Sequence, residues 1–108
     1  MISVVHLSSA HPRSDIRIFV KECKSLVKGG YSVSLVVADG KGDGENAGVA
    51  IYDVGASRGR FDRIRTAPSR VLAKAVALDA DIYHLHDPEL IPVGLKLKKY
   101  GKKVIFDS

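Results

Sequence analysis

The sequence has little cysteine and no long apolar run, and each shortage excludes a class of protein. Cys23 is the single cysteine among 108 residues, so the chain has neither an internal disulfide framework nor a cysteine metal cluster. Its place within an apolar stripe predicts an inert thiol in the core. No run approaches the roughly 18 apolar residues of a membrane span, and MISVVHL lacks the basic start of a signal peptide. We therefore expect a cytoplasmic protein.

Glycine is missing at the places where common α/β enzymes need it. The turn from Ser8 to Asp15 contains none, whereas a dinucleotide fold carries G-x-G-x-x-G there to let the backbone approach the pyrophosphate. The P-loop pattern is missing too, and no serine stands in a G-x-S-x-G elbow. These absences argue against an NAD-binding domain and against the commonest α/β hydrolase, and no cofactor is expected.

Apolar strand-like runs alternate with helical stripes, and 45% apolar residues suffice for one core. Helices are predicted from Ile16 to a stop at Gly29, from Pro68 through VLAKAVAL, and from Asp87 to a stop at Gly101. The glycine-rich DGKGDGENAG is predicted to be a loop, too short for a usual parallel crossover, so the direction of the third strand stays open. The predicted strands are residues 2–7, 33–38, 49–54, 82–85 and 103–106.

This order predicts one α/β domain over residues 1–108, a Rossmann-like, open, mostly parallel sheet with helices on both faces. In the last helix, Asp87 is expected to cap free N–H groups, with Pro88 at the first helical position. Its predicted core stripe is Leu90, Ile91, Gly94 and Leu95. The chain stops at a strand end that should lead into another helix, so we expect a truncated domain.

Ligands of open α/β sheets bind beyond the carboxyl ends of the strands, and this rule selects the candidate site residues. His84 and His86 lie two apart on a strand, so both point to one face, with His86 nearer the rim. A metal pair with Asp87 is an alternative, but no third strong ligand follows nearby, and no metal is expected. His84 is interpreted as structural. The polar residues at or just after strand ends are His11, Asp15, Arg17, His86, Asp87 and Asp107.

The net charge of +5 is unevenly distributed along the chain. Lysines near the end of the last helix are explained by the helix dipole. An arginine-rich stretch has no such explanation, and it is either a solvated face or a contact for anionic lipid. Nucleic acid is disfavoured because aromatic residues are scarce there. The stretch contains Arg58, Arg60, Arg63, Arg65, Arg70 and Lys74.

Two motifs carry a resemblance that covers nearly the whole chain. They are DIRIF, residues 15–19, and HLHDP, residues 84–88, set within HPRSDIRIFVKECKSLVKGGYSVSLVVADG and DADIYHLHDPELIPVGLKLKKYGKKVIFDS. The sequence resembles the N-terminal domain of retaining family 4 glycosyltransferases of the two-domain GT-B type, particularly those of bacterial surface polysaccharide biosynthesis.

The resemblance implies a domain that binds a glycan or lipid-linked acceptor, while an absent C-terminal domain binds the sugar nucleotide. It implies that His86 contacts the transferring sugar, and we assign His11, Asp15, Arg17 and Asp87 to substrate binding. Many relatives have Gly-Gly near Arg13, and that departure leaves diphosphate contact by this loop open.

The resemblance also places the arginine stretch where such enzymes touch a membrane. We therefore expect Arg58, Arg60, Arg63 and Arg65 to contact the inner face of the plasma membrane. The rival interpretation is a stand-alone flavodoxin-like nucleotide- or phosphate-binding module without catalysis, and a metal-dependent hydrolase ranks third.

Overall fold

A six-stranded sheet organises the computed structural model, which describes residues 1–9, 22–56 and 58–107. The strands are β1 (Ser3–Leu7), β2 (Ser32–Val37), β3 (Gly44–Asn46), β4 (Val49–Asp53), β5 (Ile82–Leu85) and β6 (Lys103–Phe106). The helical segments are α1 (Lys24–Lys28), α2 (Gly59–Phe61), η2 (Asp62–Thr66), α3 (Ala67–Leu78), η3 (Pro88–Leu90) and α4 (Ile91–Lys99). Among these helices, none is long and apolar enough to cross a membrane.

The strands lie in the order β3-β4-β2-β1-β5-β6, and every neighbouring pair is parallel except β3 with β4. The third predicted strand, whose direction the sequence left open, is β4, and it runs parallel to β2. The chain returns along β3, so this parallel connection needs no helix.

The glycine-rich segment is therefore only partly a loop, because β3 lies within it. Asn46 pairs with Val49, which leaves Ala47 and Gly48 as a two-residue hairpin turn. Both turn residues have positive φ, 53° and 84°, as the tight hairpin turns that match the twist of the strands require. An alanine in the first position hides the Asn-Gly signal that is usual for such a turn.

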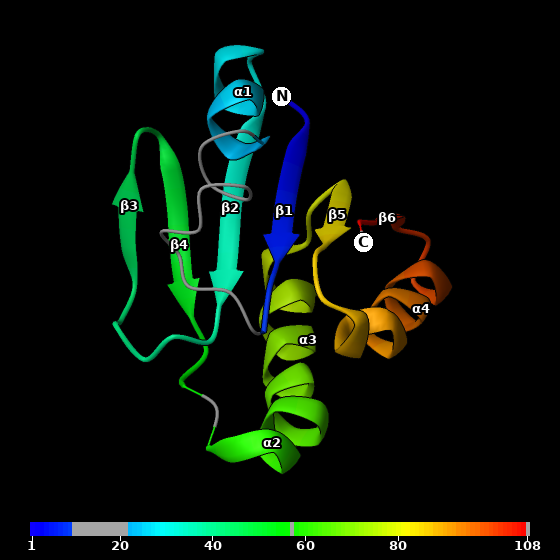
Figure 1. Ribbon diagram of the computed structural model, residues 1–108. Coiled ribbons are helices and arrows are strands. Elements are labelled where there is room, and N and C mark those ends of the chain that lie inside the picture. The colour runs from blue at the N-terminus through cyan, green and yellow to red at the C-terminus, as the bar shows by residue number, and fades with distance from the viewer. Residues whose placement is uncertain (10–21, 57, 108) are drawn as a thin grey trace.

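Helices cover both faces of the sheet, as predicted (Figure 1). On one face, Val5, Leu7 and Leu85 pack with residues of α3 and α4. On the other face, Leu35 and Ile51 lie in a second apolar cluster with Cys23 and the partly buried Leu26 and Val27 around α1. Cys23 is fully buried, as its apolar stripe predicted. The mostly parallel, Rossmann-like α/β fold is confirmed.

The helices depart from the predicted ones in two places. Helical structure begins at Gly59 and continues through α2, η2 and α3, so it starts earlier than the helix predicted from Pro68 and includes Arg60 and Arg65. In α4 the buried residues are Val93, Gly94 and Leu97, after Leu90 in η3. Ile91 and Leu95, assigned to the core from the sequence, are 47% and 53% exposed.

The second error concerns which face of a regular helix is buried. The buried positions 90, 93, 94 and 97 follow the i, i+3, i+4, i+7 spacing of one helix face, whereas the predicted stripe took in the neighbouring apolar residues Ile91 and Leu95. The first helix was predicted to start at Ile16, which lies outside the described residues, but its predicted end is confirmed, with Gly29 capping α1.

Candidate functional site

The candidate site lies where the chain connections diverge. From β1 the chain proceeds to β2 on one side, and β5 lies on the other side of β1. The carboxyl ends of β1 and β5 therefore form the switch point at which open α/β sheets bind ligands. Buried polar residues gather at this point: Ser8 and Ser9 follow β1, and His86 and Asp87 follow β5.

Asp87 joins the two strand ends. Its Oδ2 accepts hydrogen bonds from Ser8 Oγ at 2.9 Å and from the Ser9 backbone N–H at 2.7 Å. It stands at the cap position of η3, yet its side chain makes no capping hydrogen bond. The predicted capping role is therefore wrong, because the carboxylate accepts hydrogen bonds from the two serines after β1 instead. The neighbouring Glu89 accepts a hydrogen bond from Ser9 Oγ at 3.1 Å.

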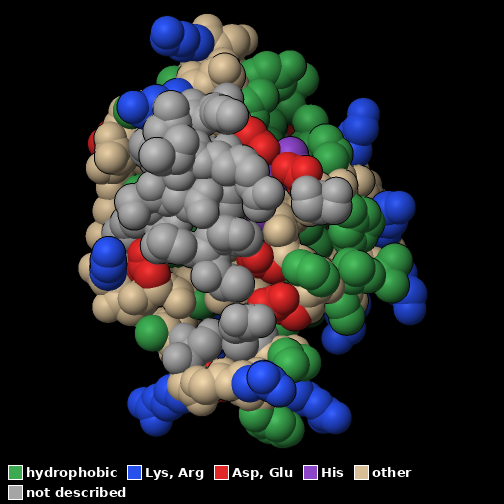
Figure 2. All heavy atoms as spheres, viewed as in Figure 1, with side chains coloured by type: hydrophobic (Ala, Val, Ile, Leu, Met, Phe, Trp, Pro, Cys, Tyr) green, Lys and Arg blue, Asp and Glu red, His purple; other side chains and the backbone are tan. Residues whose placement is uncertain are grey.

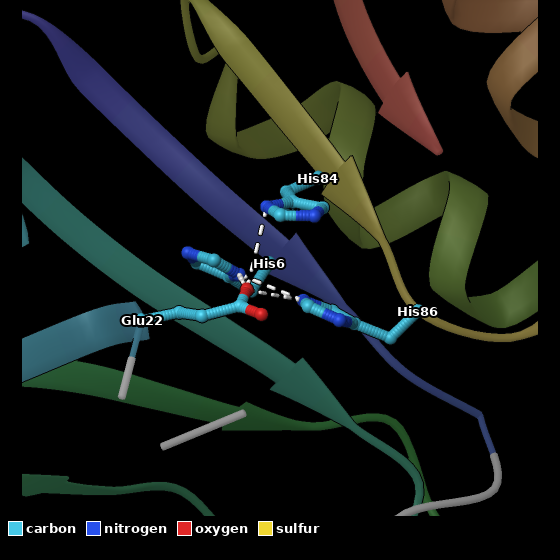
Figure 3. Close-up of side chains that lie close together, drawn as sticks. All are labelled: His6, Glu22, His84 and His86. Atoms are coloured by element: carbon cyan, nitrogen blue, oxygen red, sulfur yellow. Dashed lines mark hydrogen bonds and ion pairs between the residues drawn. The ribbon is translucent and has the colours of Figure 1, made fainter. Parts of the chain in front are cut away.

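Three histidines and a glutamate face one another across the strands (Figure 3). His6 on β1 pairs in register with His84 on β5, and His86 follows on the same face. Nδ1 of His6 and Nε2 of His86 share a hydrogen bond of 2.8 Å. Oε2 of Glu22, just before α1, lies 3.6 Å from His6 Nδ1, 3.5 Å from His84 Nδ1 and 3.5 Å from His86 Nε2.

A second carboxylate faces the opposite nitrogens of two of these rings. Oδ2 of Asp107, directly after β6, lies 3.6 Å from His84 Nε2 and 3.7 Å from His86 Nδ1. The rings of His84 and His86 are stacked, with centroids 4.4 Å apart. Each of these two imidazoles therefore has Glu22 at one nitrogen and Asp107 at the other.

Burial keeps the deepest histidine neutral. His6 is fully buried, and burial, with the charges of His86 and His84, lowers its pKa to about 3. Burial also lowers the pKa of His84, against the opposing influence of Asp107. Burial and the neighbouring Glu22 raise the pKa of the Cys23 thiol to about 12. The cluster thus offers neutral ring nitrogens beside carboxylates, and the adjacent thiol stays protonated.

Sequence reasoning missed His6 and Glu22. The signal for His6 was present, since His6 lies between the core-facing Val5 and Leu7 and therefore points to the other face of the sheet. The sequence does not show that His6 pairs with His84, because this pairing depends on β1 and β5 being neighbouring strands. We expected His86 to lie nearer the rim than His84, but the structure shows the opposite exposure. The His84 side chain is 19% exposed, and that of His86 is fully buried.

Other predicted site residues are placed differently. His11, Asp15 and Arg17 lie outside the described residues. The metal pair that was weighed with Asp87 is not the arrangement found, since Asp87 binds the serines and Glu22 faces the histidines.

The arginine stretch divides into two groups. Arg70 is bound internally, with Nε donating to the carbonyl of Val54 at 2.8 Å and Nη1 3.2 Å from Asp62 Oδ1. The side chain of Lys74 lies over the ring of Tyr52. The other described side chains, Arg58, Arg60 and Arg65, are exposed, and the side chain of Arg63 lies outside the described part.

Apolar side chains are exposed among these arginines. Phe61 is 72% exposed and Ile64 is 53% exposed. The guanidinium carbon of Arg65 lies 5.8 Å from the centre of the Phe61 ring. Figure 2 shows cationic side chains flanking an apolar patch at the end of the molecule where Figure 1 places α2. We call this surface, Arg58, Arg60, Phe61, Ile64 and Arg65, the basic-apolar surface.

Comparison with known proteins identifies the fold. No family model matches the sequence, and no curated protein matches it. The E. coli trehalose-6-phosphate synthase bound with UDP-2-fluoroglucose superposes with a TM-score of 0.64 at 14% identity, over 96% of this chain and 32% of that enzyme. The C-terminal domain of a Pyrococcus furiosus hydrogenase superposes with a TM-score of 0.64 at 12% identity, over 99% of this chain and 92% of that domain.

The fold is thus similar to part of a GT-B glycosyltransferase. The chain spans about a third of that enzyme's length, as its 32% coverage states. The hydrogenase domain has the same architecture in a different functional setting, so the fold by itself does not determine the chemistry. The function has to be argued from the switch-point residues.

Proposed function

We propose that this chain is the acceptor-side domain of a retaining GT-B glycosyltransferase of family 4, of the kind that builds bacterial surface polysaccharides. It acts with a donor-binding domain in transferring a sugar from a sugar nucleotide to a glycan or lipid-linked acceptor. The observation that carries the proposal is the buried polar group at the switch point of a GT-B-like fold, formed by Ser8, Ser9, His86 and Asp87.

In this proposal His86 is the catalytic residue that contacts the transferring sugar, and Asp87 supports acceptor binding. The bonds from Ser8 and Ser9 to Asp87 fix the end of β5 against the end of β1, so the backbone that carries His86 is held in place. His11, Asp15 and Arg17 lie between β1 and α1 in the sequence, outside the described residues. We propose that they contact the substrate.

The test is transfer by the complete gene product against a panel of sugar nucleotides, with a lipid-linked acceptor supplied. We expect product from the complete protein and none from the 108-residue chain alone. Donor-binding groups belong to the other domain in this proposal, so the chain alone lacks half of the site. Transfer catalysed by the chain alone would contradict this division of roles.

The assignment of His86 is tested by comparing His86→Ala with His84→Ala in the complete protein. We expect the larger fall in turnover for His86→Ala, because His86 follows β5 at the switch point while His84 lies within the strand. Melting temperatures of both variants separate catalysis from folding. Equal falls in turnover with equal falls in melting temperature would assign both histidines a structural role.

We also propose that the protein binds the cytoplasmic face of the plasma membrane as a peripheral protein. The basic-apolar surface supports this, since exposed arginines attract anionic lipid headgroups and the exposed Phe61 and Ile64 suit the headgroup boundary. A surface of this kind would place the acceptor-side domain next to a lipid-linked acceptor.

A further inference from the structure

We propose that His6, Glu22, His84 and His86 form a binding site for one divalent transition-metal ion of the zinc class. One ligand atom from each of the four residues lies within 4.8 Å of the other three. Their donor set, three imidazole nitrogens and a carboxylate oxygen, is one that zinc prefers. The inference rests on this cluster alone and does not depend on the proposed transferase activity.

Four of the six distances between the ligand atoms lie close to those of a tetrahedral ion, and all six are within 4.8 Å. Zinc bonds to histidine nitrogen at about 2.0–2.1 Å, so the ligand atoms of a tetrahedral site lie about 3.3 Å apart. Glu22 Oε2 lies 3.6, 3.5 and 3.5 Å from the facing nitrogens of His6, His84 and His86. His6 Nδ1 and His86 Nε2 are 2.8 Å apart, so an ion requires them to separate by only about half an ångström. The dashed lines in Figure 3 converge on the Glu22 carboxylate.

The outer nitrogens of two rings support the same assignment. Metal-binding histidines commonly donate their second N–H to a carboxylate, which fixes the ring and its tautomer. Oδ2 of Asp107 faces Nε2 of His84 at 3.6 Å and Nδ1 of His86 at 3.7 Å, so a shift of about half an ångström would bring either N–H within hydrogen-bond distance of it. The inner nitrogens of both rings face Glu22, so one carboxylate stands in the metal-binding position and the other behind the rings.

The site is also reachable from solvent. A cavity of about 280 Å³ is lined by His6, Glu22 and His84 together with Ser25 and Leu26 of α1. The side chains of Glu22 and His84 are 24% and 19% exposed, while those of His6 and His86 are fully buried. An ion therefore enters past Glu22 and His84 and binds against the two buried rings.

An ion at this position would join three segments of the chain. His6 belongs to β1, His84 and His86 belong to β5 and its end, and Glu22 precedes α1. Coordination at His86 Nε2 leaves the remaining proton on Nδ1, so this imidazole becomes an N–H donor toward Asp107. The ion would thus hold α1 on the sheet and occupy Nε2 of His86 while Nδ1 points to Asp107, so metal binding and a sugar contact through a ring nitrogen of His86 are alternative states of this residue.

The test is metal binding by the untagged 108-residue chain. Purified protein is analysed for metal content by mass spectrometry, and the metal-free protein is titrated with Zn²⁺ by calorimetry. We expect one Zn²⁺ per chain and no binding of Mg²⁺, which prefers oxygen ligands. Co²⁺ bound in place of Zn²⁺ should show the intense visible absorption of a four-coordinate site. A stoichiometry well below one, or only weak octahedral Co²⁺ absorption, would overturn the proposal.

Variants locate the site, and they are chosen at its exposed side so that the fold survives. Glu22→Gln and His84→Gln should weaken Zn²⁺ binding more than Asp107→Asn, for which about a 10–100-fold loss is expected. Glu45→Gln, an exposed glutamate on β3, is the matched control and should bind as the parent does. Unchanged affinity in both Glu22→Gln and His84→Gln would place the ion elsewhere and overturn the proposal. A failed sugar-transfer assay leaves these binding measurements unaffected.

Discussion

Asp53 is the last residue of β4, and its side chain fixes the backbone of the loops at the carboxyl ends of the strands. Its carboxylate accepts hydrogen bonds from the N–H groups of Gly40 at 3.1 Å, Gly42 at 2.9 Å and Gly55 at 2.9 Å. Partial burial alone would raise the pKa of Asp53, but the bonds from Gly42, Gly55 and Gly40 outweigh it and lower that pKa. One side chain thereby joins the segments that follow β2 and β4.

Asp53→Asn tests this role through pH. At pH values above the ordinary pKa of 3.8, the ionised carboxylate of the parent contributes its full stabilisation. We expect the free energy of unfolding of the variant to be lower by about 1–3 kcal/mol there. Because the folded-state pKa lies below 3.8, this advantage falls as the pH drops through it. Urea unfolding between roughly pH 7 and pH 3 measures the difference. A difference that stays constant into acid would contradict the prediction.

For single residues, the residue type and its neighbours in the sequence predict the hydrogen-bond partners of a side chain only when those partners are close in the sequence. Asp87 was assigned to capping because it precedes Pro88, but its partners are Ser8 and Ser9, 79 and 78 residues away. His84 and His86 were paired from their spacing, while His6 needed the register of a distant strand. The local motif was therefore visible in the sequence, and the complete histidine cluster was not.

Gly94 allows α4 to approach β5 and β6 closely. A Cβ built on Gly94 would lie 2.6 Å from atoms of the Phe106 ring and 2.9 Å from Leu85 Cδ2. Leu85 is 1% exposed and cannot withdraw into solvent, although Phe106 is 42% exposed. Any side chain at this position therefore has to displace a packed neighbour.

Gly94→Ala should destabilise the protein by about 1–3 kcal/mol, as overpacking does, even though alanine is the better helix former by about 1 kcal/mol. Thermal unfolding measures the change, at about 4–8 °C per kcal/mol in a domain of this size. Gly29→Ala is the matched control, because Gly29 has a φ of −78° and the nearest neighbours of its added Cβ are at 3.5 Å. A Gly94→Ala variant as stable as the control would show that the helix shifts freely.

At the scale of elements, the parallel strands were predictable because continuous apolar runs mark strands buried on both faces. The short β3 was not, because a three-residue exposed strand carries no apolar pattern. The face of α4 was misassigned because the apolar Ile91 and Leu95 also fall at helical spacing, although both are exposed. Errors therefore fall where the apolar pattern is absent, as in β3, or compatible with two faces, as in α4.

For the whole molecule, the alternation of strands and helices predicted the fold class, and the GT-B-like comparison confirms it. The assembly of the site was harder to predict, since His6, Glu22 and His84 come together only through strand order. The basic-apolar surface shows the reverse case. Its arginines were evident from the sequence, whereas the exposure of Phe61 and Ile64 beside them emerged only from the helical path of α2 and η2.

This surface leads to a prediction about the molecule as a whole, namely binding to vesicles that contain anionic lipid. Each arginine near such a surface contributes about 1 kcal/mol, so binding should weaken as salt rises from about 0.05 to about 0.5 M. Replacing Arg58, Arg60, Arg63 and Arg65 with glutamine should abolish co-sedimentation. Phe61→Ser with Ile64→Ser should weaken it at constant charge, since both side chains are exposed.

The matched control removes the same charge elsewhere, by replacing the exposed Lys28, Lys98, Lys99 and Lys103 with glutamine. Both quadruple variants lower the net charge of +5 by the same amount, so a response to net charge alone would weaken both equally. We expect the lysine variant to keep most of its binding, because Lys28 ends α1, the other three lysines lie on and after α4, and none of the four lines the pocket that Ile64 and Arg65 share. If the arginine variant sediments with anionic vesicles as fully as the parent, the arginines are a solvated face and the membrane proposal fails.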